Sequence, residues 1–211
     1  AGPGDWSNSE STGVVPVAPA LIPISNHDGD GEYLVDWEDV ATATSYRLEE
    51  DDNSEFNSPT VRYEGANTQY QVSAQEAGIW HYRVRATNVY GHSPWSDPEQ
   101  AGVVTAAPVL SSVDEPDAYG HYLVSWNDVT GATSYELQED DNDAFESAVT
   151  LYTGSSTQFG VADQLLGTWY YRVRAYNGAG YSLWSGAQWV LVWAEWGVYL
   201  PLVLRGSTGG P

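Results

Sequence analysis

Two runs of oxygen-bearing side chains, residues 49–53 and residues 138–143, are the parts of this sequence best suited to bind a ligand. Carboxylate and amide oxygens are the ligands that calcium prefers in proteins. Neither run has the spacing of a calcium-binding loop or the glycine of its turn, so a solvated turn rich in Asp and Asn is the favoured interpretation. No cofactor is therefore predicted. Calcium stays open as a ligand of Asp51, Asp52, Asp140, Asp141 and Asp143.

Catalytic chemistry has little support in the sequence. The four histidines are scattered, and none stands at metal-ligand spacing from another. The chain has no cysteine, which excludes thiol chemistry and Cys-ligated zinc. Paired carboxylates for glycoside hydrolysis can be found in any acidic chain, so their presence alone indicates no active site. We predict no catalytic residue, no cofactor-binding residue and no enzyme activity.

Four of the seven cationic residues, all of which are arginine, stand shortly before a tryptophan. Arg83 and Arg85 precede Trp95, and Arg172 and Arg174 precede Trp184 in the same way. An arginine over the face of a tryptophan stabilises a fold by roughly 0.5–2 kcal/mol. We therefore interpret these residues as a structural ladder on the outer face of a strand.

The elements that must position these side chains are short strands separated by Gly, Asn, Asp and Pro turns. The side chains of residues 33–37 are expected to point alternately to the two faces of a strand. Residues 80–86 form the strongest strand, with Trp80 and Tyr82 among its inward side chains. Residues 169–175 repeat that strand and begin at Trp169. No window shows a sustained period of 3.6 residues, so the predicted class is all-β with essentially no helix.

The chain repeats itself with a shift of 89 residues. Residues 18–106 and 107–195 are identical at 41 of 89 positions without a gap, and Trp37 falls on Trp126. The repeat predicts two domains, at residues 18–105 and 106–192, each large enough to bury a modest core. An N-terminal arm (residues 1–17) and an apolar C-terminal segment (residues 193–211) remain outside them.

The pattern within each repeat resembles a fibronectin type III domain of the bacterial secreted form. In the first repeat it comprises Trp37, Tyr46, residues 82–86, Asn88, Gly91, Ser93 and residues 95–96. The resemblance implies two tandem seven-stranded, Ig-like β-sandwiches, with Trp37 and Trp126 in their cores. The family usually ties one corner with a Tyr hydroxyl where this chain has Trp80 and Trp169, which leaves that hydrogen bond open. Leu165 and Leu166 replace Glu76 and Ala77, so this corner is expected to be more buried in the second repeat.

Composition limits the partners and the compartment. The net charge of −22 argues against nucleic acid and anionic membrane surfaces as partners. The chain contains no Met, so Ala1 is expected to follow a removed secretory signal, and a secreted, extracellular or cell-surface location is predicted. The C-terminal apolar stretch is too short and too polar to span a membrane.

The two ends carry the functional hypothesis. An unpaired apolar strand is a template for pairing with another chain. The predicted assembly residues are Val14, Val15, Trp193, Trp196, Val198, Tyr199, Leu200, Leu202, Val203 and Leu204. We expect a non-enzymatic structural subunit whose copies join head to tail, without covalent links, into an extracellular filament or surface assembly. The alternatives are a carbohydrate-binding or spacer module that binds polysaccharide, and a plain adhesion or receptor ectodomain.

Overall fold

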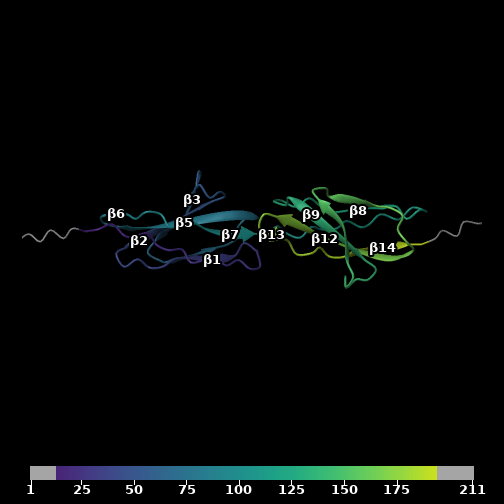
Figure 1. Cartoon of the computed structure of the whole chain (residues 1–211), viewed down its shortest axis with the longest axis horizontal. Helices are drawn as coiled ribbons and strands as arrows, with labels where there is room; N and C mark the ends of the chain where they lie inside the picture. The colour runs from purple at the N-terminus through teal and green to yellow at the C-terminus, as the bar shows by residue number, and fades with distance from the viewer. Residues whose placement is uncertain (1–12, 194–211) are drawn as a thin grey trace, which may run out of the picture.

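The computed structural model describes residues 13–193, which form two β-sandwiches placed end to end (Figure 1). No helix occurs between residues 13 and 193, so the prediction of an all-β chain is confirmed. We call the unit that contains β1 to β7 domain 1 and the unit that contains β8 to β14 domain 2. Within the same residues no helix is long and apolar enough to cross a membrane.

Domain 1 consists of a small sheet packed on a larger one. Its strands are β1 (Tyr33–Asp36), β2 (Ser45–Asp51), β3 (Thr60–Gly65), β4 (Gln69–Val72), β5 (Gly78–Asn88), β6 (Gly91–His92) and β7 (Glu99–Val103). The small sheet pairs β1 with β4, and residues 20–22 lie along β1 through the Leu21–Trp37 bridge. The larger sheet has the order β3-β2-β5-β6, and β7 also pairs with β5. All pairs are antiparallel.

Domain 2 repeats this arrangement strand for strand. Its strands are β8 (Tyr122–Ser125), β9 (Ser134–Asp140), β10 (Val149–Gly154), β11 (Gln158–Val161), β12 (Gly167–Asn177), β13 (Gly180–Tyr181) and β14 (Gln188–Val192). The small sheet pairs β8 with β11, and the larger sheet has the order β10-β9-β12-β13 with β14 also on β12.

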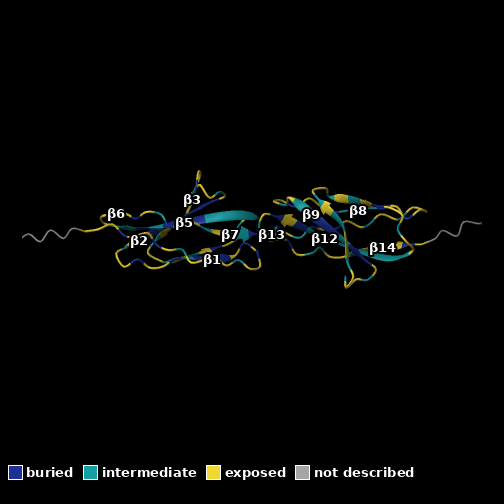
Figure 2. Ribbon diagram, in the orientation of Figure 1, coloured by how far each residue is buried: buried dark blue, intermediate teal, exposed yellow. Residues whose placement is uncertain are grey.

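The core of each domain lies between its two sheets and follows the period-two pattern of the strands. In domain 1 the alternating residues Tyr82, Val84 and Ala86 of β5 are fully buried against Val35 and Trp37. Domain 2 has an equivalent cluster around Trp126 and Tyr171. Buried segments therefore run along the middle of the strands while the loops are exposed (Figure 2).

A tryptophan ties the corner that precedes β5 and β12. The indole Nε1 of Trp80 donates a hydrogen bond to the Glu76 carbonyl at 2.8 Å, and Trp169 donates to the Leu165 carbonyl at 2.9 Å. In immunoglobulin-like sandwiches a tyrosine hydroxyl at this corner bonds to the backbone a few residues upstream. The indole N–H thus supplies the bond that the sequence left open.

The two domains meet in a close contact that we call the joint. Asn177 of domain 2 is buried, and its Nδ2 donates a hydrogen bond to the Val103 carbonyl of domain 1 at 2.9 Å. Small residues let the backbones approach, since a Cβ added at Gly102 would lie only 3.0 Å from the Ala179 Cβ. Gly178 similarly faces Ile79. The joint is therefore narrow and built largely from backbone and small side chains.

The structure overturns one expectation about the corner of domain 2. Leu165 and Leu166 are not buried; 73% and 67% of their surfaces are exposed. They lie at the end of domain 2 that faces away from domain 1, where β12 begins and β14 ends. In domain 1 the counterpart Ala77 lies against Gly131 of domain 2, although Glu76 is exposed. No described residue covers either leucine in domain 2.

Candidate functional site

The acidic loops use their own carboxylates to hold their turns. Asp51 accepts hydrogen bonds from the Ser58 backbone N–H at 2.8 Å and from Asn53 Nδ2 at 2.7 Å. Asp140 makes the same contacts with Ser147 and Asn142. Burial raises the pKa of Asp51, but the hydrogen bonds from Ser58 and its neighbours outweigh burial and leave the pKa below its usual value.

The calcium candidates do not form a cluster in the described structure. Asp52, Asp141 and Asp143 are exposed, whereas Asp51 and Asp140 point into their own loops. Between residues 13 and 193 no three His, Asp or Glu side chains are placed to hold a metal ion together. The geometry of these loops is that of Asx-stabilised turns.

The arginines beside the tryptophans stack in a ladder on the outer face of each larger sheet. The guanidinium carbon of Arg83 lies 4.4 Å from the ring centroid of Trp95 and 4.3 Å from that of Phe56. Arg85 covers Trp95 at 4.6 Å. Arg172 and Arg174 contact Trp184 in the same way, and Phe145 takes the part of Phe56. The sequence argument missed these phenylalanines, although both occupy the same place in the repeat.

The two ladders differ in how their charges are paired. In domain 1, Glu49 accepts a hydrogen bond from Arg83 at 2.7 Å and another from Arg47 at 3.0 Å. In domain 2, Gln138 replaces Glu49 and bonds to Arg172, while Arg174 pairs with Glu136 at 2.6 Å. Arg83, Arg172 and Arg174 are thus paired within their own domains, whereas Arg85 stacks on Trp95 and its buried Nε has no hydrogen-bond partner among the described residues. The stacking and the pairing within each domain favour a structural role over ligand binding.

A chain of hydroxyls and one carboxylate is buried between the sheets of each domain. Tyr82 donates its hydroxyl hydrogen to Glu50, and Tyr33 bonds to Tyr82 at 2.8 Å. In domain 2 the same chain consists of Tyr122, Tyr171 and Glu139. Burial is the main cause of the raised pKa of Tyr82 and Tyr171, and it raises the pKa of Tyr33 and of Tyr122 to about 12.

These buried phenols predict a loss of stability at high pH. The pKa of Tyr33 and of Tyr122 is higher in the folded state than the usual 10. Their contribution to stability is therefore complete below about pH 10 and is lost as the pH rises from about 10 to 12. We expect the free energy of unfolding to fall across this range. Phenolate absorbance should rise in a fast phase from exposed tyrosines and in a slower phase that follows unfolding. Tyr33→Phe should reduce the amplitude of the slower phase. A single fast phase would contradict the prediction.

The end of domain 2 that faces away from domain 1 carries a cluster of exposed apolar side chains. We call it the C-terminal pole, and it consists of Leu165, Leu166, Trp189, Leu191 and Trp193. Their counterparts in domain 1 are Glu76, Ala77, Gln100, Gly102 and Val104. Gly102 and Val104 belong to the region of the joint, where they contact Ala179 and Gly180. The C-terminal pole therefore presents larger apolar groups at positions where domain 1 contacts its neighbour.

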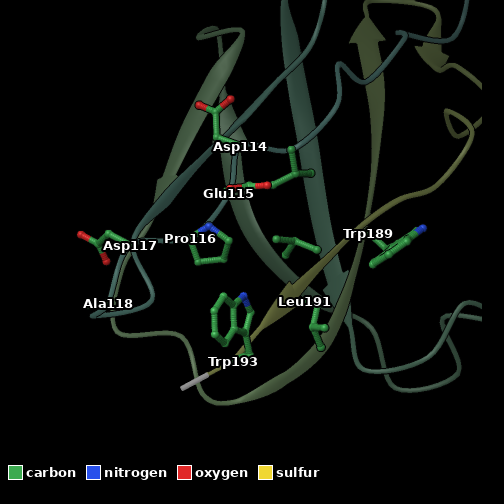
Figure 3. Close-up of a pocket in the computed structure, with 10 residues that line it drawn as sticks. Asp114, Glu115, Pro116, Asp117, Ala118, Trp189, Leu191 and Trp193 are labelled. Carbon is green, nitrogen blue, oxygen red and sulfur yellow. The ribbon is translucent and has the colours of Figure 1, made fainter. Parts of the chain in front are cut away.

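A shallow groove crosses this pole. It has a volume of about 450 Å³ and lies between residues 113–118 on one side and β14 with Trp193 on the other (Figure 3). Trp189 and Leu191 are exposed on β14, and Trp193 follows directly after the strand and lies beside Pro116. Asp114, Glu115 and Asp117 give the opposite wall its negative charge.

Some of the predicted assembly residues lie within residues 13–193, and the others lie outside the described residues. Trp193 is part of the C-terminal pole, and Val14 and Val15 lie at the opposite end of the molecule with 65% and 47% of their surfaces exposed. Trp196, Val198, Tyr199, Leu200, Leu202, Val203 and Leu204 lie outside the described residues. The assembly role of all these residues stays a prediction.

Comparisons with known proteins agree with the fold. No family model matches the sequence. The chain is 35% identical over 105 residues to fibronectin type III domain-containing protein 7 of Mus musculus, and 34% identical over 104 residues to that of Homo sapiens. Each match covers 49% of this chain and 13% of the relative, so the chain spans only a small part of the length of these proteins.

A solved structure shows the same tandem arrangement. The two-domain fibronectin type III segment of chicken tenascin covers 85% of this chain, and this chain covers all of that segment, with a TM-score of 0.55 and 15% sequence identity. The chain thus consists of two tandem fibronectin type III-like domains. Such domains are generally non-enzymatic and are typical of extracellular or surface proteins.

Proposed function

We propose that this chain is a non-enzymatic structural subunit of an extracellular filament or surface assembly, joined head to tail through its ends. The observation that carries the proposal is the C-terminal pole. Three of its residues, Leu166, Leu191 and Trp193, are the counterparts in domain 2 of the residues Ala77, Gly102 and Val104, by which domain 1 contacts domain 2. Exposed apolar patches of this kind mark interaction surfaces on soluble proteins.

The composition defines the type of link between subunits. The chain has neither Cys nor Lys, so the links have to be non-covalent. The net charge of −22 makes copies repel one another at low ionic strength. Added salt is therefore expected to promote association, because it screens the charge while leaving apolar contacts intact.

Assembly can be tested by sedimentation velocity and negative-stain electron microscopy of the purified protein at low and raised salt. We expect extended oligomers or fibres that grow with salt. The variant Leu165→Glu/Trp189→Gln/Leu191→Gly carries the residues that domain 1 has at these positions, and it should stay monomeric and folded. Removal of residues 194–211 should have the same effect, because the predicted pairing strand lies there.

Val109→Ala is a matched control, because Val109 is exposed, lies outside the C-terminal pole and has Ala20 as its counterpart in domain 1. This variant should assemble like the original protein. If the pole variant and the truncated chain both assembled normally, the proposed role of the C-terminal pole and tail would be wrong. A protein that stayed monomeric under all salt conditions would overturn the assembly function.

The groove supports a second candidate function, which is carbohydrate binding by a module beside another protein. Trp193 lies against a wall that carries Asp114 and Asp117, and Trp189 is exposed nearby (Figure 3). Aromatic faces combined with polar groups are suited to stack on sugar rings and bond their hydroxyls. Pull-down on insoluble polysaccharides, with Trp189→Ala/Trp193→Ala as the comparison, tests this function. Equal retention of both proteins on every polysaccharide would exclude it.

A further inference from the structure

The N-terminal arm continues the 89-residue repeat. Seven of its 17 positions are identical to residues 90–106: Gly2, Trp6, Ser7, Glu10, Gly13, Val14 and Val15 match Gly91, Trp95, Ser96, Glu99, Gly102, Val103 and Val104. Gly2, Trp6 and Ser7 also match Gly180, Trp184 and Ser185 of domain 2. The arm therefore has the sequence of the final segment of a repeat.

The matched residues have defined structural roles in both domains. Gly91 and Gly180 adopt φ values of +141° and +143°, which side chains rarely permit. Trp95 and Trp184 stack under the arginine ladder. The hydroxyl of Ser96 accepts a hydrogen bond from the Val84 N–H at 3.1 Å, and Ser185 does the same for Val173. Each role needs a partner strand from the same domain.

The register of these contacts in domain 1 indicates where such a partner strand would stand for the arm. Ser96 bonds to a residue 12 positions earlier, and Trp95 stacks on Arg83, which also stands 12 positions earlier. In the same register the partners of Ser7 and Trp6 would precede residue 1.

The described end of the arm contacts domain 1 as the end of domain 1 contacts domain 2. Asn88 Nδ2 donates a hydrogen bond to the Val14 carbonyl at 2.9 Å, which reproduces the bond from Asn177 to Val103. Val15 lies over Gly91, and Val104 lies over Gly180. The ring of Tyr90 covers Gly13, where Ala179 covers Gly102. In these contacts residues 13–15 pack on domain 1 as residues 102–104, at the end of domain 1, pack on domain 2.

The surrounding surface of domain 1 has no further partner among the described residues. We call it the N-terminal pole, and it is formed by residues 88–91 together with Val14 and Val15. Val89 and Tyr90 are 85% and 54% exposed, although their counterparts Gly178 and Ala179 lie in the joint. The C-terminal pole of another copy could not form the same joint here, because Val14 and Val15 already occupy the place of its last strand.

We propose that residues 2–15 are the closing segment of a further fibronectin type III-type unit that precedes residue 1 in the polypeptide, and that this unit docks on the N-terminal pole of domain 1. The inference rests on other residues than the proposed assembly does, but it limits that assembly. With a unit docked at this pole, a head-to-tail contact between copies would join the C-terminal pole to a surface other than the N-terminal pole of domain 1. The inference identifies the partner of this pole as a domain of the same kind, held by the Asn88–Val14 hydrogen bond and by apolar contacts with Val89 and Tyr90.

The proposal can be tested with a chimera in which residues 18–89 of this chain precede Ala1. The repeat register is then kept, and residues 18–89 followed by residues 1–17 form one complete unit. We expect a third folded unit, with a calorimetric enthalpy of unfolding that rises by about one half because this enthalpy scales with the number of folded residues. A second chimera with residues 107–178 in front of Ala1 guards against a mismatch in the first. Two added segments that both stayed unfolded and protease-sensitive would overturn the proposal.

Two substitutions in the arm test whether folding of the added unit depends on Trp6. In either chimera Trp6→Ala should abolish the added transition, whereas Asp5→Ala should leave it, because position 5 differs in all three segments while Trp6 recurs. An added unit that folds equally well with Trp6→Ala would contradict the closing role of the arm.

NMR relaxation measures whether the added unit docks on domain 1. The added unit should tumble together with domain 1, and Asn88→Ala should loosen this contact as Asn177→Ala loosens the joint. A folded unit that tumbled freely would overturn the assignment of the N-terminal pole as its docking surface.

Discussion

Tyr171→Phe is expected to lower the free energy of unfolding of domain 2 by about 2–4 kcal/mol, and to cost more than Tyr82→Phe costs domain 1. Tyr171 is fully buried, and its hydroxyl donates to Glu139, of which only 8% is exposed. Removing the hydroxyl leaves a buried carboxylate without its donor. This is among the few changes that destabilise a protein strongly without creating a cavity.

The asymmetry between the domains follows from one neighbouring position. In domain 1, Glu50 also contacts Arg62, with Nε and Oε2 3.5 Å apart, and Gln75 reaches it at 3.4 Å. Domain 2 has Leu151 where domain 1 has Arg62. Glu50 therefore keeps a cation after Tyr82→Phe, whereas Glu139 has no arginine at that position after Tyr171→Phe.

Urea unfolding of single and double variants measures the effect. Leu151→Arg should recover part of the stability lost in Tyr171→Phe, because it transfers the cation of domain 1 to domain 2. Tyr122→Phe is the matched control, since it removes the outer hydroxyl and leaves the bond to Glu139 in place. Equal losses for Tyr82→Phe and Tyr171→Phe would show that Arg62 does not support Glu50.

The strands and the core could be predicted because their signals are local. Alternation along residues 80–86 places Tyr82, Val84 and Ala86 on one face whatever the rest of the chain does, and these residues are buried as expected. The 89-residue repeat then transfers each assignment to the second domain. The stacking of arginine on Trp95 was also predictable, because Arg83 and Arg85 point outward from β5. Trp95 itself lies in the segment between β6 and β7 rather than on a strand.

Contacts that depend on what lies beyond a domain were harder to predict. Leu165 and Leu166 were expected to be buried because they are apolar, but burial there depends on a neighbour that domain 1 has and domain 2 lacks among the described residues. The hydrogen bond at the corner could not be predicted, because the indole N–H of Trp80 replaces a tyrosine hydroxyl and the two side chains differ in shape. In the arm, Trp6 stands 89 residues before Trp95, but this match lies outside the pairing of residues 18–106 with residues 107–195.

Trp126→Ala is expected to destabilise domain 2 by about 3–5 kcal/mol, which is a large part of the 5–15 kcal/mol typical of a folded domain. Trp126 is 5% exposed and packs edge-on against Tyr135, with ring centroids 5.8 Å apart. Its indole Nε1 has no hydrogen-bond partner among the described residues. The loss therefore comes from the cavity, and Trp126→Phe, which fills most of that space, should cost much less.

The same variant shows whether the two domains unfold as one unit. The joint rests on the hydrogen bond from Asn177 to Val103 and on contacts of the glycines Gly102 and Gly178, which have no side chain to bury. Scanning calorimetry of Trp126→Ala should therefore shift the transition of domain 2 to lower temperature and leave domain 1 nearly unchanged, while Trp37→Ala should do the reverse. If both transitions moved together, the joint would have to transmit several kcal/mol, far more than its few contacts provide. Separate transitions would mean that the joint sets the orientation of neighbouring domains while each core supplies its own stability, so that domains of this kind can be added at either pole without refolding those already present.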